Sequence, residues 1–155
     1  MSVYQRLEEM GLELPAAPRP VASYVPFVKT GNLVYISGQI PIAGGQVLAT
    51  GTVPDRVPPD KAAAAAKLCA LNMLAVLEEA AGGDLNRVTR VVRLGVFVAS
   101  HPDFTDQPKI ANGASDLMVH IFGEEVGRHA RAAVGSVSLP LGVPVEIEGL
   151  FELAG

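Results

Sequence analysis

The sequence predicts an α+β fold in which two main helices cover one face of a mixed sheet. Apolar residues alternate with polar ones over several short runs, as in strands, and recur every three or four residues over longer runs, as in helices. The resulting order is two strands, room for a third, then helix, strand, helix and two strands, so helices and sheet form separate layers. One sheet face then stays uncovered, and such a face, where apolar, usually becomes an interface between subunits.

A short helix is expected at the N-terminus, because apolar residues recur there at helical spacing before a glycine suited to a left-handed C-cap. These residues are Tyr4, Leu7, Met10 and Gly11. The proline-rich segment 14–20 then breaks regular structure. We therefore expect an N-terminal helical extension over residues 1–20 and one main domain over residues 21–155.

The main domain is expected to begin with a hairpin of two strands, residues 24–28 and 33–37, joined by a turn at Gly31. Pro26 has no N–H group, so the first strand should be irregular or lie at an edge of the sheet. A glycine pair at residues 44–45 marks another turn.

The strongest helical pattern begins at Pro58 and ends at Gly83, with Asp60 near the positive end of the helix dipole. Its apolar residues surround the helix, so we expect the sheet to cover one side, and a neighbouring subunit could cover another. A long strand over 88–99 follows. Alternation places one set of its residues on one face, namely Val88, Val92, Leu94, Val96 and Val98, and the other set on the opposite face, namely Val91, Arg93, Gly95 and Phe97.

A second helix is expected over residues 112–122, followed by strands over 131–138 and 143–153. The last strand alternates strictly between an apolar and an acidic face. The apolar face holds Val143, Val145, Ile147, Gly149, Phe151 and Leu153, and the other holds Pro144, Glu146, Glu148, Leu150 and Glu152. By itself this pattern indicates a half-buried strand with its acids in water.

A functional interpretation of those acids needs a cation nearby, and the preceding segment supplies Arg128 and Arg131. A guanidinium fork could hold the carboxylate of a small acid substrate, while a protein carboxylate orients or deprotonates a water. An arginine–glutamate pair across neighbouring strands is also a common structural salt bridge. Spacing alone leaves both interpretations open.

Composition and charge exclude several classes of protein. A hydrophobic fraction of 49% rules out a disordered chain, and a net charge of −4 gives no general attraction to phosphate backbones. A single cysteine cannot form an internal disulfide, which fits a reducing compartment. We expect no signal peptide, because residues 1–10 are charged and lack an apolar core, and no membrane span. These features favour a cytoplasmic protein.

Other residues that could carry chemistry favour structural roles. Cys69 lies in mid-helix and is expected to be a small core residue. We expect His129 to be a surface residue, although beside Arg128 and Arg131 it could raise the local positive potential. Two pairs of small residues indicate either tight packing or backbone open to a ligand, namely Ser37-Gly38 and Gly135-Ser136. No metal motif is recognisable among the dispersed histidines His101, His120 and His129.

Two separated segments carry a resemblance to a known family. The first comprises Tyr24 and residues 31–41, and the second comprises residues 130–134, followed by 139–140 and 145–148. Together they resemble the signatures of the RidA/YjgF family of reactive-intermediate deaminases, also known as endoribonuclease L-PSP-like proteins. The resemblance extends over residues 24–153, and the N-terminal helix and residues 127–131 are similar to a divergent branch of the family.

The resemblance implies a chorismate-mutase-like α+β fold and a homotrimer with clefts between subunits. It implies hydrolysis of 2-imino acids or their enamine tautomers, such as 2-aminoacrylate and 2-iminobutanoate, to 2-oxo acids and ammonia, with no metal or cofactor. By position, it implies that Arg131 binds the substrate carboxylate and that Glu146 positions the attacking water. The cleft residues that it implies are Tyr24, Ser37, Gly38, Asn112 and Ala133, the last replacing a cysteine of many members.

Two other functions stay open. The first is a trimer that binds small carboxylates or partner proteins without turnover, against which the retention of Arg131 and Glu146 argues. The second is an endoribonuclease or translation inhibitor. A net charge of −4, with three Tyr, five Phe and no Trp, offers no evident basic surface for stacking bases.

Overall fold

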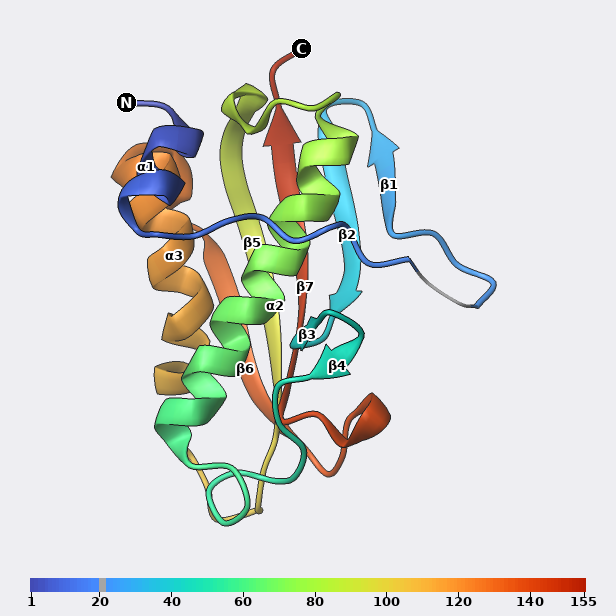
Figure 1. Ribbon diagram of the computed structural model, residues 1–155, viewed down its shortest axis with the longest axis vertical. Helices are drawn as coiled ribbons and strands as arrows, with labels where there is room; N and C mark the ends of the chain where they lie inside the picture. Colours follow the sequence, from blue (N-terminus) through green and yellow to red (C-terminus); the bar gives the residue numbers. More distant parts are fainter. Residues whose placement is uncertain (20–21) are drawn as a thin grey trace.

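The computed structural model describes residues 1–19 and 22–155, and it confirms the predicted α+β fold (Figure 1). The main sheet consists of β1 (Phe27–Thr30), β2 (Leu33–Gln39), β5 (Val88–Ala99), β6 (Ala130–Ser136) and β7 (Val145–Leu153). Its order is β1-β2-β7-β5-β6, with β5 and β6 parallel and the other neighbours antiparallel. A separate hairpin pairs β3 (Ile42–Ala43) with β4 (Gln46–Val47) around the predicted glycine turn.

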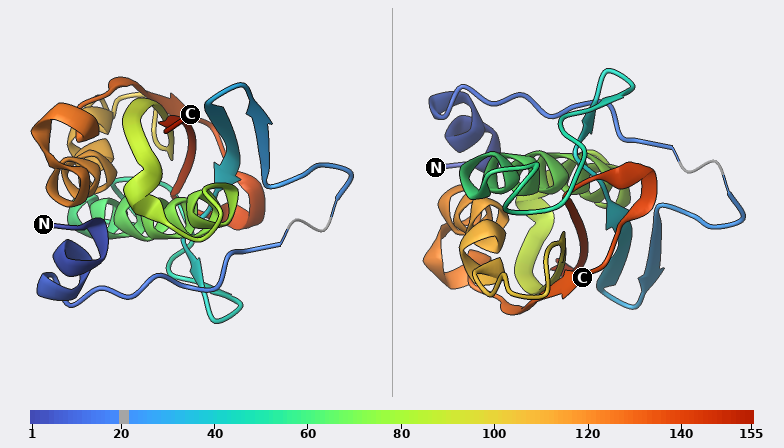
Figure 2. Two further views of the ribbon diagram at one scale, coloured as in Figure 1. Left: turned by 90° about the horizontal axis from the view of Figure 1, so that it is seen from above. Right: turned by 90° about the horizontal axis from the view of Figure 1, so that it is seen from below.

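The helices lie on one side of this sheet (Figures 1 and 2). Those of the described residues are α1 (Val3–Glu9), α2 (Pro59–Ala80) and α3 (Gln107–Gly127), with short 3-10 turns at Leu85–Arg87 and Pro140–Gly142. Helices α2 and α3 pack directly on the sheet and on each other, and α1 packs against α3. The expected boundary between an extension and a main domain, at residues 20 and 21, lies outside the described residues.

The chain itself covers the outer side of α2. The extended segment that follows α1 crosses this helix (Figure 1), and Leu12, Leu14 and Ala17 pack there against the core. Arg19 pairs with Glu79 of α2 at 3.0 Å. The apolar residues all around α2 are therefore explained without a neighbouring subunit, which the sequence alone left as an option.

The central strand β5 corrects one prediction. Its pairing with β7 shifts register twice, between Val88 and Arg90 and between Val91 and Arg93. Each such irregularity inserts a residue and reverses the alternation of side chains beyond it. Val91 is therefore fully buried in the core, whereas Val92, predicted for the core face, is only half-buried. From Leu94 onward the predicted alternation is correct.

Several element boundaries also differ from prediction, and the differences are largest at β1 and α3. Strand β1 begins at Phe27 instead of residue 24, because Pro26 has no N–H group and accepts from Ser37 only through its carbonyl. Helix α3 is longer than the predicted 112–122, because Pro108 is tolerated in its first turn. A kink at Gly123, with φ of 83°, separates its last turn.

The sheet face away from the helices is uncovered and partly apolar. Val28 of β1, Tyr35 of β2 and Val134 of β6 are 54%, 48% and 46% exposed there. Register pairing places Val28, Tyr35 and Leu150 in one row across this face. We refer to it below as the open face.

Gly113 sets how closely α2 and α3 approach, because a Cβ at this position would overlap the carbonyl oxygen of Ala63. Gly113→Ala should therefore destabilise the fold by about 1–3 kcal/mol, the usual cost of overpacking. The better helix propensity of alanine, worth about 1 kcal/mol, offsets only part of that loss. Urea denaturation measures the change, and Asp116→Ala, at an exposed position of α3, is the matched control. A Gly113→Ala protein as stable as the wild type would contradict the close approach.

Candidate functional site

Glu146, at the start of β7, lies in a cavity of about 480 Å³. A register shift in β2 between Ile36 and Gln39 brings Gly38 against its carboxylate. A Cβ at Gly38 would overlap that carboxylate, so only glycine allows the approach. The cavity is lined by Pro18, Arg19, Tyr24, Pro26, Gly38, Gln39, Ile40, Ile42, Pro140, Leu141 and Glu146. We call Tyr24, Gly38 and Glu146 the glutamate half-site.

Ser37 shapes this half-site through the backbone. Its hydroxyl donates to the carbonyl of Val25 at 2.7 Å, and its N–H donates to the carbonyl of Pro26 at 2.9 Å. These bonds hold the segment after Tyr24 beside β2. Ser37 therefore belongs to the site region as predicted, but its side chain is engaged with the protein.

The Glu146 carboxyl is electrostatically unusual. Burial raises the pKa of this half-buried group, and the nearby charge of Glu148 raises it further. Glu148 itself is held on the open face by the Tyr35 hydroxyl at 2.6 Å and by Arg93 at 3.4 Å. Glu146 accepts no hydrogen bond from the residues that the structure describes. A carboxylate without partners and with a raised pKa is suited to accept a proton from water.

Arg131, on the edge strand β6, contacts α3. Its Nη1 donates to Oδ1 of Asn112 at 2.8 Å and to Oγ of Ser115 at 3.1 Å. Asn112 and Ser115 are three residues apart, so they lie on the same side of the helix. The structure thus brings two of the predicted residues, Asn112 and Arg131, together. Within the described part of the chain, Arg131 forms no ion pair with a carboxylate.

Sequence reasoning missed the partner of Ser115. Nε2 of His129 lies 2.8 Å from Oγ of Ser115, and Nδ1 lies 2.7 Å from the carbonyl oxygen of Gly127. His129 is half-buried, so the prediction of a surface histidine was wrong. The spacing of His129 and Arg131, two residues apart at the start of a strand, could have indicated a shared face. We call Asn112, Ser115, His129 and Arg131 the arginine half-site.

Ala133 lies on the same face of β6 as Arg131 and packs against the core. It contributes no polar side chain. Because β6 is an edge strand of the described sheet, its outer N–H and C=O groups are open to a ligand.

The two half-sites lie on opposite faces of the sheet. Arg131 pairs with Leu94 of β5, and Glu146 pairs with Phe97 of the same strand. Residues three apart in a regular strand point in opposite directions, and paired residues share a face. The Arg131–Glu146 salt bridge that the sequence left open therefore does not form within one chain.

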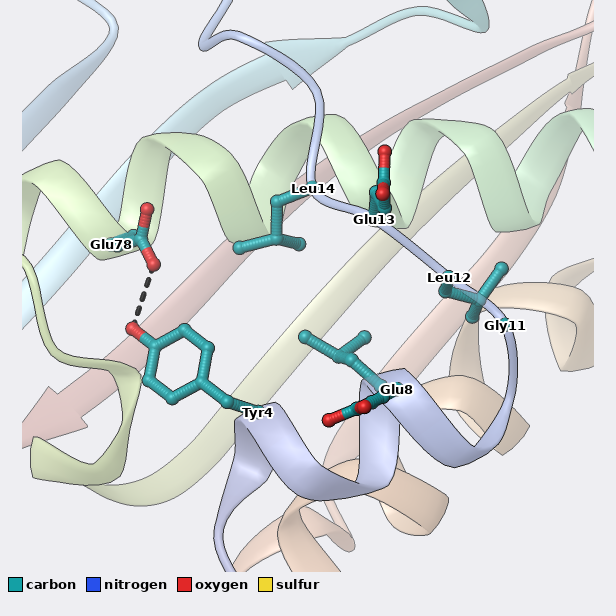
Figure 3. Close-up of a pocket in the computed structure, with 8 residues that line it drawn as sticks. Tyr4, Glu8, Gly11, Leu12, Glu13, Leu14 and Glu78 are labelled. Carbon is teal, nitrogen blue, oxygen red and sulfur yellow. Dashed lines mark hydrogen bonds between the residues drawn. The ribbon is translucent and has the colours of Figure 1, made fainter.

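Three other cavities formed by the described residues contain none of the residues predicted from the resemblance. One of them, of about 620 Å³, lies between α1, the segment after it and α2 (Figure 3). There the Tyr4 hydroxyl donates to Glu78 at 2.7 Å and accepts from the N–H of Leu85 at 2.9 Å. Burial and the bond to Glu78 raise the pKa of Tyr4 to about 12, so the phenol stays protonated. Gly135 and Ser136 line another cavity, of about 480 Å³, beside His101.

Cys69 is fully buried in α2, with its sulfur 3.7 Å from the carbonyl oxygen of Val145, and burial raises its pKa, as expected for a core residue. Residues 1–19 and 22–155 contain no group of three or more His, Cys, Asp or Glu side chains arranged to hold a metal ion. None of the helices in these ranges is long and apolar enough to cross a membrane.

Comparison with known proteins agrees with the fold. The family model described as "YjgF/chorismate_mutase-like, putative endoribonuclease" matches residues 4–151. Protein TCP17 of Trypanosoma cruzi is 47% identical over 97% of this chain and 94% of its own length. A protein of Dermatophagoides farinae named 2-iminobutanoate/2-iminopropanoate deaminase is 32% identical over 90% of this chain and 92% of its own. The crystal structure of Atu1372 from Agrobacterium tumefaciens, of unknown function, superposes with a TM-score of 0.90 at 45% identity, covering 99% of this chain and 92% of that one.

The carboxyl of Glu146 is expected to titrate above the ordinary glutamate range. Its raised pKa means that the folded state favours the neutral carboxyl. The contribution of Glu146 to folding stability is therefore fully present below its pKa in the unfolded chain, and it is lost as the pH rises through its pKa in the folded protein. NMR titration of the Glu146 carboxyl carbon measures this pKa. Glu148→Gln should lower the pKa of Glu146, and Glu152→Gln, farther along the same strand face, should leave it unchanged. An ordinary pKa at Glu146 would place this carboxyl in bulk water.

Proposed function

This chain belongs to the YjgF/chorismate mutase-like family, and we propose that it hydrolyses 2-imino acids or their enamine tautomers to 2-oxo acids and ammonia. The D. farinae relative carries the name of this activity, for 2-iminobutanoate and 2-iminopropanoate. The net charge of −4 disfavours a nucleic-acid substrate.

The observation that carries the proposal is the state of Arg131. A single nitrogen of its guanidinium is engaged, and its partners there are neutral oxygens. The remaining N–H donors have no partner among the described residues, so they are available for a carboxylate. A planar fork of this kind recognises a carboxylate through paired hydrogen bonds.

The chemistry follows from these groups. In a protonated imino acid, the C2 carbon is already electrophilic, so catalysis consists of fixing the substrate and delivering a water. Arg131 holds the carboxylate, and Glu146 accepts a proton as the water oxygen bonds to C2. The same proton passes from Glu146 to the amine nitrogen. As the C–N bond then breaks, Glu146 takes the proton of the C2 hydroxyl, and a 2-oxo acid and ammonia are left.

A second copy of the chain completes the site in this proposal. Arg131 and Glu146 face opposite sides of one sheet, so a small substrate reaches both only when they come from different subunits. The open face, with Val28, Tyr35 and Val134 exposed, is the surface that assembly would cover. We propose a cyclic homotrimer, in which each interface joins the arginine half-site of one chain to the glutamate half-site of the next.

Substitutions of the two residues should have different effects. Arg131→Lys keeps the charge but loses the planar fork, so kcat/KM for 2-iminobutanoate generated in situ should fall about ten- to hundredfold. Glu146→Gln should still bind 2-oxobutanoate, an unreactive analogue, while its turnover falls by a factor of about a hundred or more. Arg128→Lys is the matched control, because Arg128 is exposed and pairs with Glu124. If the wild type fails to accelerate imine decay over buffer for several imino acids, the chain is a carboxylate-binding module.

Subunit mixing tests the shared cleft directly. Light scattering should give about three times the 16.2 kDa chain mass. Arg131→Ala and Glu146→Gln trimers, each inactive alone, should regain about a quarter of wild-type activity after co-refolding at equal amounts, because three-quarters of the trimers are then mixed and each has one intact cleft. Co-refolding each variant with itself is the control. A monomer, or no recovery in the mixture, would exclude the inter-subunit site.

A further inference from the structure

We infer that Ser115 and His129 are positioning residues for Arg131, and that they hold its guanidinium through a hydrogen-bond chain that requires a neutral imidazole. This inference rests on the proposed role of Arg131 in carboxylate binding. It adds two residues, and a dependence on pH, that sequence reasoning did not assign to the site.

The donor and acceptor of each hydrogen bond in this series follow from its last acceptor, the carbonyl oxygen of Gly127. The carbonyl oxygen of Gly127 can only accept, so Nδ1 of His129, at 2.7 Å, carries the proton. In the neutral ring Nε2 is then an acceptor, and the Ser115 hydroxyl donates to it at 2.8 Å. With its own proton used, Oγ of Ser115 accepts from Nη1 of Arg131 at 3.1 Å. Every donor in the chain has one acceptor.

Asn112 completes the hold on Arg131. Its Oδ1 accepts from the same nitrogen at 2.8 Å, so Nη1 is fixed from two points on α3. Ser115 is the more buried of the two anchors, with 9% of its surface exposed, and its hydroxyl has no freedom to turn while His129 accepts from it. The position of the guanidinium is thus tied to the state of a ring outside the cleft.

The surroundings of His129 oppose its protonation. Arg131 of β6 shares the Ser115 hydroxyl with His129. Two other arginines, Arg90 of β5 and Arg128, line a hollow together with His129. Arg128 is paired with Glu124 at 2.7 Å, and Arg90 donates to the carbonyl of Glu125 at 3.2 Å. Burial is the largest effect on the pKa of His129 and lowers it. The hydrogen bond to Gly127 raises this pKa, and the charge of Arg131 lowers it.

Protonation would break the chain at one atom. Nε2 would become a donor, and Oγ of Ser115 would have to accept from both His129 and Arg131. Two cations would then share one hydroxyl, and the Ser115 proton would lose its acceptor. We therefore expect acidification through the His129 pKa to release Arg131 and weaken carboxylate binding.

The test measures binding of 2-oxobutanoate by calorimetry, and KM and kcat for 2-iminobutanoate, from pH 5 to 8. Ser115→Ala and His129→Phe should each raise Kd and KM about three- to tenfold at pH 7.5, the usual effect of one lost hydrogen bond, with kcat nearly unchanged. His129→Gln keeps an acceptor and does not titrate, so it should restore binding and remove the rise in Kd that the wild type shows at acidic pH. His120→Phe, at an exposed position of α3, is the matched control.

A spectroscopic readout makes the test independent of turnover. In ¹⁵N NMR of the wild type at pH 7.5, His129 should be neutral with its proton on Nδ1. A charged ring, a proton on Nε2, or unchanged Kd values in both Ser115→Ala and His129→Phe would overturn the inference. If Arg131→Lys itself leaves imine hydrolysis intact, the proposed function fails instead. If Arg131→Lys weakens binding while the Ser115 and His129 variants do not, only the present inference fails.

Discussion

The alternation of side chains along the second half of β5 determines where every polar group of the site points. Beyond its register shifts, this strand runs regularly from Leu94 to Val98, with β6 on one side and β7 on the other. A residue paired with Leu94 faces the helices, and a residue paired with Phe97 faces the open side. Arg131 therefore meets the polar side chains of α3, whereas Glu146 meets the bulge of β2. A shift of one residue in either pairing would exchange these environments.

This separation has an electrostatic consequence. If Arg131 and Glu146 shared a face at close range, each would neutralise the other, and the cation would lower the pKa of the carboxyl. The guanidinium donors would also be used within the protein. With the sheet between them, Arg131 is held by the neutral oxygens of Asn112 and Ser115, and burial raises the pKa of Glu146. Both groups thereby keep the properties that the proposed carboxylate binding and water activation require.

Long, regular patterns could be predicted from the sequence, and contacts between elements could not. Helix α2 and strand β5 match their predicted ranges because many residues repeat one period. Val91 is buried in place of Val92 because of register shifts between β5 and β7. These shifts depend on the partner strand and cannot be recognised from the periodicity of β5 itself. The hydrogen bond from Ser115 to His129 joins residues 14 apart in two elements, so it depends on how α3 packs on β6. The resemblance supplied Arg131 and Glu146, but their opposite orientation depends on β5 lying between β6 and β7, which is a property of the sheet order.

Polar side chains on the sheet that have hydrogen-bond partners differ in their expected role from those that have none. At the centre of the open face, Glu148 accepts from both Tyr35 and Arg93, so this group of charges is paired before anything covers it. Burying a paired charge costs far less than burying an isolated one, so a second copy can cover this region. Within the described residues, the Glu146 carboxylate and the outer donors of Arg131 have no such partners. Assembly would desolvate them as well, and a substrate carboxylate and a bound water then supply the partners that the protein omits. The same rule that makes the centre of the open face suitable for an interface thus makes Glu146 on this face, and Arg131 at the edge strand β6, suitable for a site.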